Sequence, residues 1–115
     1  MNVNEVIIQA VTPIVPVCVP DLYRPDARED PADVYCVFNY TESSDIFGDD
    51  EPQAVGYLIQ LHLYLPTGRT PIQMKRQLRR AMLDAGFIVG DFINASDEEA
   101  QHYVLACRWM DWEVG

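Results

Sequence analysis

Histidine and cysteine are the side chains of this sequence best suited to catalysis or metal binding, and they are few. His62, His102, Cys18, Cys36 and Cys107 are spread widely along the 115 residues. No CxxC pair occurs, and neither histidine has partners at a spacing typical of a metal site. We therefore expect no catalytic, metal or cofactor site, and we interpret the cysteines as reduced apolar fillers. A small enzyme or metal-binding domain, with a Cys–His pair formed across strands, is the alternative.

An acidic segment between two expected strands is the second candidate for chemistry. Its acids are adjacent rather than alternating, and no helix pair flanks them, which disfavours an EF-hand calcium loop. We expect a long, flexible, acidic loop over residues 42–53, because a loop of this length in a small domain is disordered or binds a partner. Its partner-facing residues are predicted to be Asp45, Phe47, Asp49, Asp50 and Glu51.

A basic stripe on the second expected helix is the sharpest signal in the sequence. Five of the eight bases lie between Arg69 and Arg80, although the chain has eighteen acids. Arginine beside aliphatic side chains is typical of an interface, and a solvated helix face is the alternative. The predicted subunit or partner interface consists of Arg69, Ile72, Lys75, Arg76, Arg79, Arg80 and Leu83. Because basic and acidic surfaces on different sides complement each other head to tail, the pattern suggests a cyclic homo-oligomer.

Charge and hydropathy exclude several classes of function. The formal net charge of -10 disfavours binding to nucleic acid or to an anionic membrane surface. The apolar stretch Val6–Val19 contains Pro13 and Pro16, and it is too short and interrupted to span a bilayer. It follows no basic segment, so we do not expect a signal peptide. The composition predicts an intracellular globular domain.

The elements that must position these residues are predicted from periodicity. Apolar side chains at helical spacing indicate a helix that Asn2 or Asn4 caps and that ends near Pro13. Residues 17–33 should form an irregular, proline-rich connection. A second helix is expected after Thr70, with Thr70 and Gln73 as a capping box and Gly86 at its end. Alternating residues predict strands over Val34–Thr41, Ala54–Leu65, Phe87–Ala95 and Gln101–Val114.

These elements predict a single domain over residues 1–115, of the α+β class and in the order α-β-β-α-β-β. Four such strands most simply form one mainly antiparallel sheet with two helices packed on it. One face would cover the core. The other face would carry Leu58 and Tyr64, and it is too apolar to be left to solvent.

The order of elements resembles the tail-completion, or tail-terminator, proteins of long-tailed phages, a family that includes the minor tail protein U of phage lambda. The likeness covers nearly the whole chain. It rests on the proline-rich run Pro16–Tyr23 after the first helix, the strands Tyr35–Glu42 and Tyr57–Tyr64, the basic helix closing at Leu83–Phe87, and Gln101-His102-Tyr103 at the start of the last strand. Trp109 and Trp112 are not part of the resemblance.

The resemblance implies a structural virion protein, made in the cytoplasm of a bacterial host, rather than an enzyme. Such subunits form hexameric rings that cap the tail tube and join it to the head. Implied partners are other copies of the chain, the tail-tube protein and a head connector or neck protein. DNA passes through the ring without binding, and a negative lining would repel its phosphates. Alternatives are a related neck or head-completion protein, a bacterial adaptor of the same fold, and an acidic DNA-mimic inhibitor.

Overall fold

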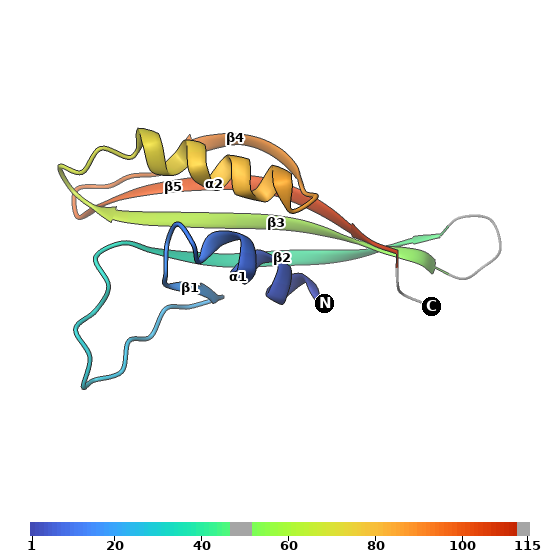
Figure 1. The fold of residues 1–115 in the computed structure, drawn as a ribbon, viewed down its shortest axis with the longest axis horizontal. Coiled ribbons are helices and arrows are strands. Elements are labelled where there is room, and N and C mark those ends of the chain that lie inside the picture. The colour runs from blue at the N-terminus through green and yellow to red at the C-terminus, as the bar shows by residue number, and fades with distance from the viewer. Residues whose placement is uncertain (47–51, 113–115) are drawn as a thin grey trace.

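The computed structural model describes residues 1–46 and 52–112 (Figure 1). Its elements are α1 (Val3–Val11), β1 (Cys18–Pro20), β2 (Tyr35–Ile46), β3 (Pro52–Pro66), α2 (Ile72–Asp84), β4 (Ile88–Asn94) and β5 (Ala100–Asp111). The predicted α+β class is confirmed. The sheet has five strands rather than the predicted four, so the order is α-β-β-β-α-β-β.

The five strands form one mixed, open sheet in the spatial order β1-β2-β3-β5-β4. β1 runs parallel to β2, and the other neighbouring pairs are antiparallel. β3 is the central strand, and its Leu61 is paired with Phe38 on one side and Leu105 on the other. All three side chains are fully buried, so the middle of the sheet is also the middle of the core.

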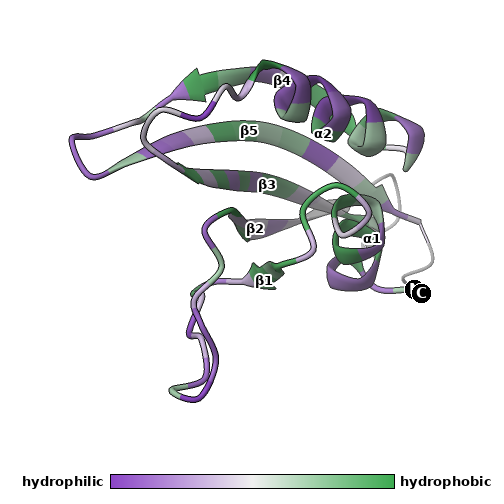
Figure 2. Ribbon diagram, turned by 60° about the vertical axis from the view of Figure 1, so that its left-hand side comes forward, coloured by the Kyte–Doolittle hydropathy of each residue, from purple (hydrophilic) through white to green (hydrophobic). Residues whose placement is uncertain are grey.

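Both helices pack on the same face of the sheet and leave the other face uncovered (Figure 2). α1 buries Val3, Ile7 and Val11, which recur every four residues and so share one side of a helix. α2 buries Leu78 and Met82 at the same spacing. These side chains meet the inward residues of the strands in a single apolar cluster, which explains the one-sided architecture. No helix within residues 1–46 and 52–112 is long and apolar enough to cross a membrane.

The helix ends follow the sequence only in part. Asn2 caps α1 as predicted, since its side-chain oxygen accepts a hydrogen bond of 2.9 Å from the amide of Glu5. The predicted capping box of α2 is wrong, because Pro71 occupies the N-cap position and leaves Thr70 one residue too early. Gly86 ends α2 with φ of 97°, a left-handed conformation that favours glycine.

β1 is a strand that was not predicted, and it lies within the predicted irregular connection of residues 17–33. It pairs Cys18 with Cys36 and Val19 with Val37 in parallel register. Three residues are too few to show alternation, and Pro20 argues against a strand unless the strand lies at an edge. At the edge, the missing donor of Pro20 costs no ladder hydrogen bond. The rest of the connection has no regular element, as predicted.

The acidic loop is shorter than the predicted span of residues 42–53. β2 continues to Ile46 and β3 begins at Pro52, with Glu42 paired to Tyr57 and an irregularity between Asp45 and Ile46. Each added antiparallel pair supplies backbone hydrogen bonds, so the ladder extends through side chains that are polar and uninformative about alternation. The resulting β2–β3 hairpin projects beyond the helices and lengthens the molecule to 53 × 31 × 24 Å (Figure 1).

Candidate functional site

The predicted interface residues lie on and beside the outer side of α2, and we call them together the basic face. All of them except Arg69 belong to α2, and Arg69 lies in the turn that precedes the helix. The two aliphatic members are exposed, Ile72 by 54% and Leu83 by 39%. The basic face therefore combines cations with exposed apolar surface, which is the composition that the sequence pattern suggested.

Three of the cations make contacts within the protein. The ammonium of Lys75 lies 4.5 Å from the ring centre of Tyr103, a cation–π distance. Arg79 donates from Nε to the backbone oxygen of Gly90 at 3.1 Å, and this ties α2 to β4. Arg80 forms an ion pair with Asp84 at 3.1 Å, and both side chains are largely exposed. Since an exposed pair stabilises by less than about 1 kcal/mol, Arg80 remains free to change partners.

Arg76 is the central cation of the basic face. It borders a hollow of about 290 Å³ with Ile72, Lys75, Arg79 and Phe92. On its other side it borders a second hollow, of about 410 Å³, with Arg80 and Asp84 among its lining residues. Arg76 makes no ion pair with any residue that the structure describes. Its guanidinium is therefore available to a partner.

The uncovered face of the sheet is a second candidate surface, which we call the open face. It carries alternate residues of the three long strands: Tyr35, Val37, Asn39, Thr41 and Ser43 of β2; Gly56, Leu58, Gln60, His62 and Tyr64 of β3; His102, Val104, Ala106, Arg108 and Met110 of β5. These positions include no carboxylate, although the chain has eighteen acids. A nearly neutral, half-apolar face on a strongly acidic protein is typical of a protein contact rather than of free solvent.

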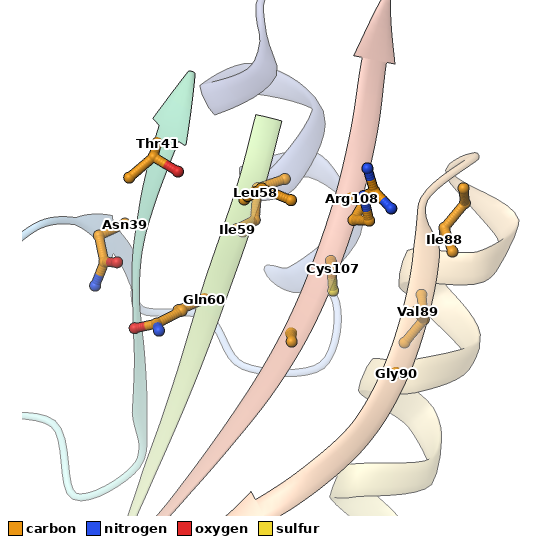
Figure 3. A pocket seen from close by; sticks show the side chains of 11 residues that line it. Asn39, Thr41, Leu58, Ile59, Gln60, Ile88, Val89, Gly90, Cys107 and Arg108 are labelled. Atoms are coloured by element: carbon orange, nitrogen blue, oxygen red, sulfur yellow. The ribbon is translucent and has the colours of Figure 1, made fainter. Parts of the chain in front are cut away.

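A groove of about 610 Å³ crosses one half of the open face (Figure 3). The groove is lined by four residues that lie in register on four neighbouring strands: Thr41, Leu58, Arg108 and Ile88. Leu58 is 50% exposed and Ile88 is 66% exposed. These two side chains supply apolar surface, whereas Thr41, Arg108, Asn39 and Gln60 supply polar groups. Alternation predicted that Leu58 lies on this face, but it gave no signal for the contribution of β4.

A ladder of stacked rings occupies the other half of the open face. The ring centre of Tyr64 lies 4.9 Å from that of Tyr35 and 4.2 Å from that of His102. Tyr23 extends the ladder, with its ring centre 4.6 Å from that of Tyr35. These cross-strand pairs fix the side-chain orientations on β2, β3 and β5. Period-two alternation predicted which face each residue takes, but it contains no signal for stacking between distant strands.

His62 and His102 form a hydrogen-bonded pair within this ladder. The amide nitrogen of Asn39 donates to Nε2 of His62 at 3.2 Å, because Asn39 Nδ2 can only donate. Nδ1 of His62 then carries the proton and donates to Nε2 of His102 at 2.8 Å. This arrangement requires both rings to be neutral. Burial lowers the pKa of both histidines, and the neighbouring His102 lowers the pKa of His62 further.

The pair predicts a loss of stability in mild acid. The charge of Asp97 raises the pKa of His102 and so offsets part of the effect of burial. The ring of Tyr64 stacks on that of His102. Since the folded pKa values lie below the unfolded value of about 6.5, the unfolded chain binds protons first as pH falls. We expect the free energy of unfolding to be constant above about pH 6.5 and to decrease below it, in urea titrations between pH 7.5 and 5. The double variant His62→Gln/His102→Gln should lack this decrease, and parallel profiles would refute the assignment.

The cysteines lie on the opposite side of the sheet from the histidines. Cys18, Cys36 and Cys107 are buried and unpaired, and they belong to the core beneath the helices. Burial raises the pKa of Cys18 and Cys107 to about 12, and it raises that of Cys36 as well. A thiol so protonated is a poor nucleophile or metal ligand. The Cys–His pair that the sequence left open is therefore not formed.

The predicted partner-facing loop lies mostly outside the described residues. Asp45 is at the end of β2, paired with Ala54, whereas Phe47, Asp49, Asp50 and Glu51 lie in the part that the structure does not describe. Within residues 1–46 and 52–112, no group of three or more His, Cys, Asp or Glu side chains is arranged to hold a metal ion. The geometry therefore offers contact surfaces and, in the described part of the chain, no cluster of three such ligands for a metal.

Comparison with known proteins adds no assignment to this geometry. No protein-family model matches the sequence, and no curated protein matches it at significant similarity.

Proposed function

We propose that this protein is a phage or prophage tail terminator, a structural subunit of a ring that caps the tail tube and joins it to the head. One observation carries the proposal, which is the separation of charge. The protein has a net charge of -10, yet most of its cations gather on the basic face beside the exposed Ile72 and Leu83. A subunit whose charges are segregated in this way attracts its own copies head to tail, and a closed set of such contacts is a ring.

The open face supports a second partner in the same assembly. It is neutral and partly apolar, so it suits a contact with the tail-tube protein or with a head connector rather than a passage for DNA. In our proposal the DNA-repelling acids come from loops, such as the exposed turn that contains Asp97, Glu98 and Glu99. The proposed location is the virion, at the junction of tail and head, after synthesis in the host cytoplasm.

A DNA-mimic inhibitor is the second candidate, because a net charge of -10 on 115 residues suits the imitation of phosphate arrays. The cations of the basic face interrupt a continuous negative surface, which favours the ring. The two functions differ in a binding experiment. A mimic displaces DNA from a DNA-binding enzyme at low salt, whereas a tail terminator does not. A related neck protein, positioned one ring closer to the head, shares the physical argument for self-association.

Deletion of the gene from its phage or prophage tests the function. A terminator stops the polymerisation of the tail tube, so its loss should leave tubes of uncontrolled length and heads without tails in electron micrographs. Supplying the intact gene in trans should restore tails of uniform length. Tails of normal length attached to heads in the deletion strain would refute the proposal. Heads without tails beside tubes of normal length would instead indicate the neck protein.

A further inference from the structure

The far edge of the sheet carries an acidic loop whose charge complements the basic face of a second copy. The connection from β1 to β2 forms an exposed loop there, and its acids outnumber its bases. Residues 21–33 contain two bases, Arg24 and Arg28, and five acids: Asp21, Asp26, Glu29, Asp30 and Asp33. We call this segment the edge loop.

The edge loop is tied to the sheet at its base. The backbone amide of Ala32 donates to the hydroxyl of Tyr23 at 2.9 Å, which closes the loop between these two residues. The ring of Tyr23 packs on Tyr35 of β2 as the outermost member of the ladder. The closed segment contains Glu29 and Asp30. Both are exposed, and neither forms an ion pair within the described parts of the chain. The loop thus presents unpaired carboxylates on a segment that is closed at its base.

The basic face and the edge loop belong to opposite edges of one subunit. α2 packs beside β4, at one edge of the sheet, whereas the edge loop leaves β1 at the other (Figures 1 and 2). The order β1-β2-β3-β5-β4 places four strand spacings between these edges, which is about 19 Å. An ion pair requires its nitrogen and oxygen within about 4 Å. Within the described parts of one copy, neither Glu29 nor Asp30 forms an ion pair with Arg76, so both surfaces are open to a second copy.

We propose that the basic face of one copy, centred on Arg76, binds the edge loop of the next copy through Glu29 and Asp30. This inference rests on the ring that we propose above, and it names the contact that builds the ring. Because the two surfaces differ and lie on opposite edges, each copy uses one of each, and the contact propagates until it closes. The acidic turn at Asp97 is a poorer acceptor, since its carboxylate already accepts hydrogen bonds from the amides of Glu99 and Ala100 at 2.8 and 3.0 Å.

Charge reversal and mixing test this contact. The first variant is Arg69→Glu/Arg76→Glu, at exposed side chains that make no ion pair within the described residues. The second is Glu29→Lys/Asp30→Lys. By sedimentation velocity at low salt, each variant alone should associate at least tenfold more weakly than the wild type. An equimolar mixture should recover association, because each reversed surface then meets an oppositely charged one.

A matched control separates this contact from net charge. Glu98→Lys/Glu99→Lys changes the charge as much as the second variant does, at an exposed turn outside the contact, and should associate like the wild type. Thermal unfolding of every variant confirms that it is folded. If the wild type forms rings and both variants form them equally well, the contact is refuted while the ring function stands. If the mixture stays dissociated, the pairing is refuted. If the wild type itself remains a monomer, both proposals fail.

Discussion

Leu61→Ala is expected to destabilise the protein by about 2–5 kcal/mol. Leu61 is fully buried at the centre of the central strand, in register with Phe38 and Leu105. The substitution removes buried methyl groups and leaves a cavity that three fixed strands and the helices above them cannot close. Urea denaturation measures the change. It should be performed at high dilution, because self-association would add a concentration-dependent contribution to stability.

Leu58→Ala is the matched control for this prediction. Leu58 stands three residues earlier on the same strand and is 50% exposed on the open face. The same chemical truncation should therefore cost less than about 1 kcal/mol. Similar losses for the two variants would contradict the one-sided core and indicate that the open face is covered within the monomer.

Salt is expected to weaken self-association by about tenfold between 0.05 and 1 M NaCl. The proposed contact pairs exposed arginines with exposed carboxylates, and each such pair contributes about 0.2–1 kcal/mol. The Debye length falls from about 10 Å at 0.1 M salt to about 3 Å at 1 M, which screens these pairs. Sedimentation equilibrium over a salt series measures the association constant.

Sodium sulfate distinguishes this electrostatic contact from an apolar one. Sulfate strengthens the burial of apolar surface, so an assembly formed through the groove beside Leu58 and Ile88 should tighten in it. An assembly formed through the basic face should weaken. Association that stays unchanged or tightens in both salts would place the subunit contact on the open face instead of on α2.

Much of the fold was predictable because its strongest elements carry a clear period. The alternation from Val55 to Leu65 specified the central strand, and the spacing of Leu78 and Met82 specified the buried side of α2. Elements without a period were missed or shortened. β1 has three residues, and the ends of the β2–β3 hairpin are polar, so backbone hydrogen bonding there leaves no pattern in the side chains.

The candidate surfaces were predictable to the extent that they depend on one element. All members of the basic face lie within a single short segment, so their clustering is visible in the sequence. The His62–His102 pair joins β3 to β5 across 40 positions, and its hydrogen bond depends on strand register that no local pattern encodes. The separation of the basic face from the edge loop likewise follows from the strand order, with β1 and β4 at opposite edges.

Direct observation of the purified protein tests the central claim, which is self-association into a closed ring. Negative-stain electron microscopy at low salt should show six-fold rings with a central hole, and sedimentation should give about six times the subunit mass of 13.1 kDa. A single species of 13.1 kDa at high concentration and low salt, with no rings in the micrographs, would contradict the account.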